Sequence, residues 1–200
     1  MKKIFPILLL LTVSFCKISA QRNEIFNDRI KTLQVIVDDD WMNIPVMKLG
    51  SDSRIYIFFD DLTHTYHRYV YRIEHCEADW SKSEEIFESD YLNGFNGNTI
   101  EDEPIQSLNT TVLYNNYCIT FPNDNCSPKI SGNYRLTVYD EDNDNDNDKI
   151  LSVCFMIVEP KMSVSMTANS NTDIDINLSH QQIDLNVNYN SIRVTDPDNQ

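Results

Sequence analysis

Short segments in which apolar and polar residues alternate constrain the fold of this chain more than any other feature. Alternation with a period of two puts every second side chain on one face, which is the pattern of a half-buried β-strand. Residues 66–76 are the clearest case, because Tyr69, Tyr71 and Ile73 share one face and charged side chains occupy most of the other. The strands expected before residue 160 are 33–37, 54–59, 66–76, 111–121, 134–139 and 150–158.

Evidence for helices is thin. Residues 81–93 are expected to form a long loop with at most a short helix, because Ser81 and Glu84 stand in capping-box order. Residues 96–106 are expected to be a loop, since glycine and proline interrupt them. Several short strands with turn residues between them predict an all-β chain built around an immunoglobulin-like β-sandwich.

Two local features favour the immunoglobulin-like form of the sandwich. Tyr134 follows Ser131-Gly132-Asn133 at the start of an alternating segment, which is similar to the tyrosine corner of immunoglobulin domains. Trp80 follows the strand expected at 66–76 and suits such a domain, although immunoglobulin tryptophans usually lie within that strand.

Residues 1–20 have the parts of a secretory signal peptide. Lys2 and Lys3 give the basic start, residues 4–16 are almost uninterruptedly apolar, and Ala20 ends the segment with a small residue. The apolar run is shorter than the roughly 20 residues of a membrane-spanning helix, so a membrane anchor is the weaker interpretation. We therefore expect a chain that is exported and then soluble.

Lipid attachment at Cys16 is disfavoured, because Phe15 stands where lipoprotein processing requires a small residue. Removal of the leader takes away three lysines and no acidic residue, so the formal net charge moves from −15 to −18. A surface this acidic repels nucleic acid and anionic lipid headgroups, and the simplest interpretation of the charge is solubility.

Four cysteines remain after the leader, and they allow three disulfide pairings that the sequence does not separate. An exported chain can form disulfides, but buried free thiols inside strands are an equal alternative. The four are Cys76, Cys118, Cys126 and Cys154, and no CxxC motif occurs among them.

The texture of the sequence changes after Pro160. Residues 163–166, 173–178 and 183–189 alternate and read as the opening strands of a second β domain. We therefore divide the chain into a signal peptide over 1–20, an immunoglobulin-like domain over 21–160 and an incomplete second β domain over 161–200. An incomplete sheet would leave an exposed edge, which favours association.

The acidic connector between the strands expected at 134–139 and 150–158 is similar to a calcium loop only at first sight. Aspartates alternate from Asp140 to Asp148, as calcium ligands 1, 3 and 5 do. Asn145, however, stands where the loop needs glycine, and Leu151 stands where a bidentate glutamate closes it. A solvated hairpin tip is the better interpretation, and weak calcium binding is the alternative.

Three histidines, His64, His67 and His75, fall near one another in sequence, as zinc ligands do. Glu74 and His75 are adjacent on a strand and therefore face opposite ways, which disfavours a shared metal. No nucleophile elbow, phosphate-binding loop or zinc-protease motif occurs. We expect no catalytic, cofactor or metal site and a binding protein rather than an enzyme, with a zinc-dependent hydrolase as the weakest alternative.

An extended series of motifs resembles the first domain of the type IX secretion system plug protein. The resemblance runs from about Ile30 to Pro160 and continues into Ser179-His180-Gln181-Gln182. The motifs that carry it are Leu33-Gln34-Val35, Pro45-Val46, Leu49-Gly50-Ser51-Asp52, the segment 64–80 with its histidines, tyrosines and Trp80, Ser89-Asp90-Tyr91-Leu92-Asn93-Gly94-Phe95, Asn109-Thr110-Thr111-Val112-Leu113-Tyr114, Pro122-Asn123-Asp124, Ser131-Gly132-Asn133-Tyr134 and Cys154-Phe155.

The resemblance implies a periplasmic, mostly β protein without catalytic residues. It implies binding to the large outer-membrane barrel of the type IX translocon, whose pore the plug closes when no substrate is present. The chain would then lie at the periplasmic face of the outer membrane. The alternative is an exported glycan-binding or adhesion β-sandwich, whose exposed aromatic residues would stack on sugars. Tyr66, Tyr69, Tyr71 and Trp80 are better explained as core and sheet packing than as a recognition patch.

Overall fold

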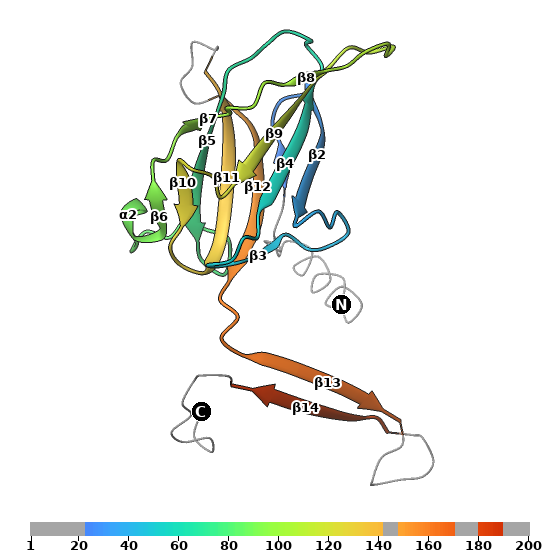
Figure 1. Ribbon diagram of the computed structural model, residues 1–200, viewed down its shortest axis with the longest axis vertical. Coiled ribbons are helices and arrows are strands. Elements are labelled where there is room, and N and C mark those ends of the chain that lie inside the picture. The colour runs from blue at the N-terminus through green and yellow to red at the C-terminus, as the bar shows by residue number, and fades with distance from the viewer. Residues whose placement is uncertain (1–22, 142–147, 171–179, 190–200) are drawn as a thin grey trace, which may run out of the picture. The chain divides into compact units, whose positions relative to one another are not determined.

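The computed structural model describes residues 23–141, 148–170 and 180–189. The chain forms two compact units, one up to Val158 and one from Glu159 (Figure 1). The expected signal peptide lies outside the described residues, so it stays a prediction, as does the division into domains. No helix in the described part of the chain has the length and apolarity needed to cross a bilayer.

The first unit contains two facing β-sheets (Figure 1), which we call sheet A and sheet B. Sheet A has the strand order β1-β12-β11-β5-β7, and β3 pairs with β12 in parallel. Its strands are β1 (Glu24–Ile25), β3 (Val46–Lys48), β5 (Tyr69–Cys76), β7 (Asn98–Thr99), β11 (Gly132–Asp140) and β12 (Lys149–Val158).

Sheet B has the order β2-β4-β9-β8, with all neighbours antiparallel. Its strands are β2 (Ile30–Val37), β4 (Ile55–Asp61), β8 (Ile105–Gln106) and β9 (Asn115–Phe121). A small third pair joins β6 (Leu92–Gly94) to β10 (Cys126–Pro128).

The order of the strands is that of an immunoglobulin-like sandwich. Sheet B corresponds to the A-B-E-D sheet of such domains, and β5, β11 and β12 correspond to the C-F-G sheet. The prediction of an all-β immunoglobulin-like sandwich is therefore confirmed. Every strand expected before residue 160 is present, with bounds that differ by a few residues; the structure adds short strands that lack a long alternating pattern.

The core lies where the inner faces of the two sheets meet. In β4 and β9 every second residue is buried, and the residues between them are partly exposed. The inward side chains are large and apolar, with Phe59 stacked on Tyr117 and Tyr134 stacked on Phe155 at ring-centroid distances of 5.3 and 5.8 Å. Burial of this apolar surface is the main force that holds the two sheets together.

A tyrosine corner fixes the entry into β11. The hydroxyl of Tyr134 donates a hydrogen bond to the carbonyl oxygen of Ile130 at 2.8 Å, four residues upstream. Gly132 is required beside it, because a Cβ at this position would lie 2.2 Å from Nε2 of His75. The predicted corner is thus confirmed, whereas Trp80 lies outside the core in a turn, with a φ of 66°.

The segment between β5 and β9 holds more structure than expected. The helix α2 (Glu88–Tyr91) begins after Phe87, whose N–H donates to the carboxylate of Asp90 at 3.0 Å. The expected start at Ser81 is wrong; Asp79 accepts the hydrogen bonds of Ser81 instead, from its N–H at 3.0 Å and its hydroxyl at 2.6 Å. Residues 96–106, expected to be a loop, contain the two-residue strands β7 and β8.

The second unit is a β-hairpin of β13 (Ser163–Asn169) and β14 (Gln182–Asn188). The register pairs Val164 with Val187 and Met166 with Leu185, so apolar side chains meet across the two strands. Both strands confirm the alternation read from 163–166 and 183–189. The strand expected at 173–178 lies outside the described residues.

Candidate functional site

The three histidines considered as zinc ligands do not converge. His67 precedes β5 and His75 lies near its far end, about 26 Å away at the usual rise of a strand. His75 packs edge-on against Tyr134 at 5.2 Å, and its Nδ1 lies 2.8 Å from the hydroxyl of Ser83. The described residues contain no group of three or more ligands that could hold a metal ion.

His67 belongs to a cluster of charged side chains at one end of the sandwich. Asp61 and Asp140 are buried there, and Arg29 lies between them. The guanidinium contacts the carboxylate of Asp140, and its Nε lies 3.9 Å from Asp61. The Tyr69 hydroxyl donates to Asp61 at 2.7 Å, and Nδ1 of His67 lies 3.5 Å from Asp140. The arginine thus offsets two carboxylates that burial alone would leave unstable.

Burial and the hydrogen bond to Asp61 raise the pKa of Tyr69, so this hydroxyl stays protonated and keeps donating. The cluster joins the end of β4, the start of β5 and the end of β11. It stabilises the base of the β11–β12 hairpin.

The acidic connector is solvated only in part. Asp140 is the last residue of β11 and is buried against Arg29, so the expectation that the whole connector is a solvated tip is wrong for this residue. A calcium loop would need the Asp140 carboxylate as its first ligand, and that carboxylate already pairs with Arg29. Residues 142–147 lie outside the described part of the chain.

The four cysteines are free thiols in the structure. Cys76, Cys126 and Cys154 are buried, and Cys118 is partly exposed on sheet B. Burial raises the pKa of Cys76 and of Cys126 to about 11, so neither thiol is a ready nucleophile near neutral pH.

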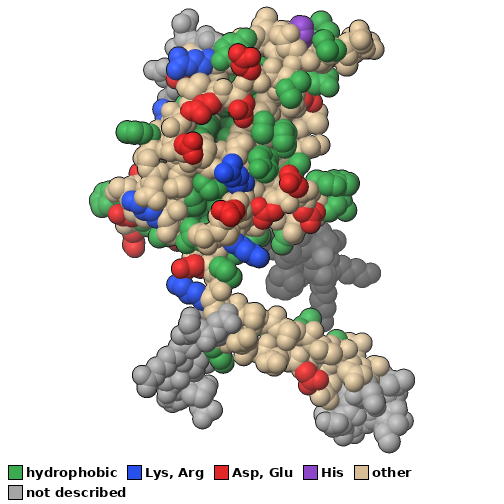
Figure 2. All heavy atoms as spheres, viewed as in Figure 1, with side chains coloured by type: hydrophobic (Ala, Val, Ile, Leu, Met, Phe, Trp, Pro, Cys, Tyr) green, Lys and Arg blue, Asp and Glu red, His purple; other side chains and the backbone are tan. Residues whose placement is uncertain are grey.

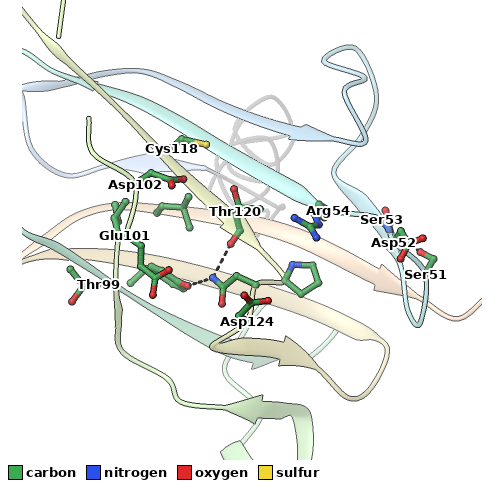
Figure 3. A pocket seen from close by; sticks show the side chains of 15 residues that line it. Ser51, Asp52, Ser53, Arg54, Thr99, Glu101, Asp102, Cys118, Thr120 and Asp124 are labelled. Atoms are coloured by element: carbon green, nitrogen blue, oxygen red, sulfur yellow. Dashed lines mark hydrogen bonds between the residues drawn. The ribbon is translucent and has the colours of Figure 1, made fainter. Parts of the chain in front are cut away.

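A polar cleft of about 390 Å³ opens at the edge of sheet B (Figure 3). Asp52, Glu101, Asp102 and Asp124 line it, and Arg54 is its one basic residue. At its floor the Asn123 side chain donates to the Tyr71 hydroxyl at 2.6 Å and to the Thr120 carbonyl at 3.0 Å. The acids come from three loops, with Glu101 and Asp102 adjacent in one of them, so the cleft is acidic without being a built site.

A second, more apolar hollow of about 660 Å³ lies on the outer face of sheet B, beside β2. Tyr56 and Phe58 of β4 form its floor, with ring centroids 6.4 Å apart and planes within 20°. Trp41, which is 74% exposed, borders it from the β2–β3 loop. The other residues that line the hollow are Gln34, Val35, Ile36 and Asp39.

The outer faces of the two sheets differ in chemistry. On sheet A, the Arg72 guanidinium lies over the ring of Tyr139 at 5.2 Å, and Glu74 pairs with Lys82 at 2.9 Å. The outer face of sheet B presents the aromatic rings of Tyr56 and Phe58 instead. Hydrophobic side chains also reach the surface between acidic ones on the face drawn in Figure 2. Apolar surface outside the core is typical of an interaction site, so the aromatic hollow is the best candidate for one.

The sequence indicated the hollow, although its residues were not singled out. In the run Ile55 to Phe59 both faces are apolar, and a strand that is buried on one side only would carry polar residues on the other. The expectation for the aromatic string is confirmed for Tyr69 and Tyr71, which are 1% and 2% exposed. Tyr66 is 62% exposed and lies outside the core.

The family model described as the type 9 secretion system plug protein first domain matches residues 30–159. This match covers most of the chain. The chain belongs to that family. The resemblance read from the motifs is thereby confirmed, and the matched residues form the sandwich that carries the hollow and the cleft.

A solved structure supports the same assignment. A hypothetical protein from Parabacteroides merdae ATCC 43184 is 40% identical in sequence, with a TM-score of 0.73. The similarity covers 88% of this chain and 43% of that protein, so the chain spans less than half the length of its relative. No characterised protein in the curated set matches this chain.

Proposed function

We propose that this chain is a non-enzymatic, periplasmic plug or gating subunit of the type IX secretion system. In this role it binds the outer-membrane translocon barrel and closes the pore when no substrate is present. The observation that supports this proposal is the plug-family match over residues 30–159.

The architecture suits a stopper. A pore wide enough for folded proteins would leak solutes unless a body of fixed shape filled one end. The sandwich offers such a body, because its core is closed by large buried rings and by the Arg29–Asp140 pair. Packed interiors of this kind deform little, so the shape of the stopper does not depend on the cargo.

Co-purification tests the assignment. The tagged chain is recovered from native outer-membrane extracts, and the bound proteins are identified by mass. We expect the large translocon barrel in stoichiometric amount. The matched control is Leu136→Asp, which places a charge in the core at a residue that is 0% exposed and should abolish folding and recovery.

Gating is tested separately in cells that lack this gene. We expect increased entry of a large dye that the outer membrane normally excludes, and restoration by the wild-type chain. Recovery of the barrel without any change in dye entry would support binding and contradict closure of the pore. Failure to recover the barrel with the folded chain would contradict the assignment itself.

A glycan-binding function is the second candidate, and the aromatic hollow is the observation that favours it. Tyr56, Phe58 and Trp41 resemble the stacking platforms on which sugars bind. Titration calorimetry with a panel of oligosaccharides tests this candidate. Heat of binding that Trp41→Ala removes would support it, and no heat with any sugar would eliminate it.

A further inference from the structure

The strand β2 forms one border of sheet B, and its outer edge has an open backbone. The N–H of Asp38 donates to the carbonyl of Arg54 at 3.1 Å, and the register pairs Ile36 with Tyr56 and Gln34 with Phe58. Hydrogen bonding alternates along an antiparallel pair, so Gln34 and Ile36 direct their backbone groups toward β4. The N–H and C=O of Val35 therefore point away from the sheet.

Val35 has no backbone partner among the described residues. Neither the sheet ladders nor the turns of the described ranges include a hydrogen bond to its N–H or C=O. Both ends of the open stretch are closed by backbone geometry. Thr32, with a φ of 55°, lies in a bulge at one end, and at the other the Val37 carbonyl accepts the N–H of Asp40 at 3.0 Å. Only a short strand has room here, which protects the edge against indiscriminate pairing.

The aromatic hollow lies along this same edge. Gln34, Val35 and Ile36 are consecutive and face alternate sides, yet all three line it. A chain paired with Val35 would therefore place its neighbouring side chain over Tyr56 and Phe58, where Trp41 encloses it from the loop. The hollow is large enough for one or two large apolar side chains.

The charge at the hollow specifies the partner further. Asp39 is exposed, lines the hollow and follows β2 directly. The adjacent Asp40 uses its carboxylate to accept the N–H of Met42 at 3.1 Å. The whole chain carries a formal net charge of −15, so a basic side chain is the complementary group for this end of the edge.

We propose that the open edge of β2 binds a short extended segment of a partner polypeptide by strand addition. The segment pairs its backbone with Val35, places an apolar side chain in the hollow of Tyr56, Phe58 and Trp41, and directs a lysine or arginine toward Asp39. Backbone pairing supplies affinity and the hollow supplies selectivity, as in other complexes formed by added strands. That the partner is the translocon barrel rests on the proposed function.

Site-specific photo-crosslinking in native cells tests this proposal with the full chain. The photoreactive p-benzoylphenylalanine replaces Trp41, and in a matched control it replaces Phe95, which is 81% exposed on a loop away from β2. We expect one crosslinked polypeptide from position 41 and none of the same mass from position 95.

Two variants of Val35 then separate backbone pairing from side-chain packing. Val35→Pro removes the outward N–H and leaves the bonds of Gln34 and Ile36 to β4 in place, which an edge strand tolerates. Val35→Ala loses side-chain packing but keeps the N–H. We expect the crosslink to fall about tenfold with proline and to persist with alanine, because the added strand loses its hydrogen bonding to Val35. Asp39→Lys, an exposed substitution, should also weaken the crosslink and serves if the proline variant does not fold.

The outcomes separate this proposal from the proposed function. A crosslink to the barrel that Val35→Pro or Asp39→Lys removes supports both. Strand addition is overturned if the barrel co-purifies but position 41 gives no crosslink, or gives one that neither substitution changes. The plug function is unaffected by that result. A crosslink to a different defined polypeptide that responds to both substitutions supports the edge and contradicts the barrel as partner. If the chain gives no crosslink and does not co-purify with the barrel, both proposals are overturned. Binding of an oligosaccharide in the hollow, in place of a polypeptide, contradicts the polypeptide as its occupant.

Discussion

The hairpins β11–β12 and β13–β14 are both antiparallel, and the sequences of β11, β13 and β14 alternate, yet one hairpin is buried and the other exposed. In the first, Leu136, Val138, Val153 and Phe155 are all 0% exposed. In the second, Met166 is 66% and Leu185 is 64% exposed, and neither strand contains a buried residue. Alternation therefore predicts that a strand forms. Whether its apolar face is buried depends on a packing partner, which another part of the chain or another molecule supplies.

The stability of a hairpin depends on that cover. A two-stranded ribbon is marginal in water by itself, because it removes little apolar surface from solvent. The β11–β12 hairpin has β5 beside it and sheet B across the core. Among the described residues β13 and β14 pair only with each other. The predictions below test how far this difference extends.

Hydrogen exchange should show the largest contrast. Amides of β11 and β12 open only with the whole sandwich, at a cost of at least about 5 kcal/mol, whereas those of β13 and β14 open locally. We expect exchange in the first hairpin to be several thousand-fold slower, measured by mass spectrometry or NMR on the full chain. Equal protection of both hairpins would show that the second is covered in solution and would contradict the comparison.

Truncation of a leucine in each hairpin comes next. Leu136→Ala empties space in the core and should lower the free energy of unfolding by about 2–5 kcal/mol. Leu185→Ala, on the exposed hairpin, should change it by less than about 0.5 kcal/mol. Urea unfolding followed by tryptophan fluorescence measures both. A similar loss for Leu185→Ala would reveal a hidden packing partner.

A buried and an exposed aspartate give a third contrast. Asp140→Asn removes the negative partner of Arg29 and should cost about 3 kcal/mol, the low end for a broken buried pair, because Arg29 is itself partly solvated. Asp184→Asn, on the exposed strand β14, is the matched control and should leave the urea midpoint unchanged. An unchanged midpoint for Asp140→Asn as well would show that the cluster contributes nothing to the sandwich.

Alkaline pH should lower the free energy of unfolding of the sandwich and leave the β13–β14 hairpin unaffected. This is the smallest of the predicted effects. The pKa values of Cys76 and Cys126 are raised from about 9 to about 11 by burial, so the folded state holds these protons while the unfolded chain releases them. Stability is therefore complete below about pH 9 and falls as pH rises toward 11, by about 1 kcal/mol per thiol at pH 10. Urea midpoints at pH 8 and pH 10 measure the loss.

The double variant Cys76→Ala, Cys126→Ala is the control for that loss. It should reduce the alkaline decline, because the two protons no longer contribute. Residues 159–200 contain no cysteine, so protection of β13 and β14 should not respond to these thiols. An alkaline decline of the same size in the double variant would assign it to the buried tyrosines instead.

The sequence predicted the long strands because alternation and short runs of β-branched and aromatic residues are local properties, and the tyrosine corner because Ser131-Gly132-Asn133-Tyr134 is contiguous. It did not predict β3 or β6, which are three residues long and exist only because β12 and β10 lie beside them. The burial of Asp140 was missed because its partner Arg29 is 111 residues away. A run of aspartates predicts solvent exposure unless a distant cation is known to face one of them.

Part of the aromatic hollow, its floor on β4, could be predicted from the sequence. The two apolar faces of β4 indicate that something other than the core contacts Tyr56 and Phe58. The position of Trp41 beside them depends on the turn after β2, where Asp38 accepts the hydroxyl of Ser53 at 2.7 Å and the N–H of Arg54 at 3.0 Å. Such contacts between separate loops have no periodic pattern in the sequence.

The parallel pairing of β3 with β12 sets the order in which this domain can close. Met47 lies opposite Ile157 and Glu24 lies opposite Ser152, so the earliest strands attach to the last strand of the sandwich. In a nascent chain that has not yet reached residue 149, β12 is absent and neither β1 nor β3 can pair with it. Contacts between such distant residues slow folding. Late closure of this kind keeps the polypeptide unfolded during synthesis. A secretory channel requires an unfolded chain, and the N-terminal segment of this chain is expected to direct it to one.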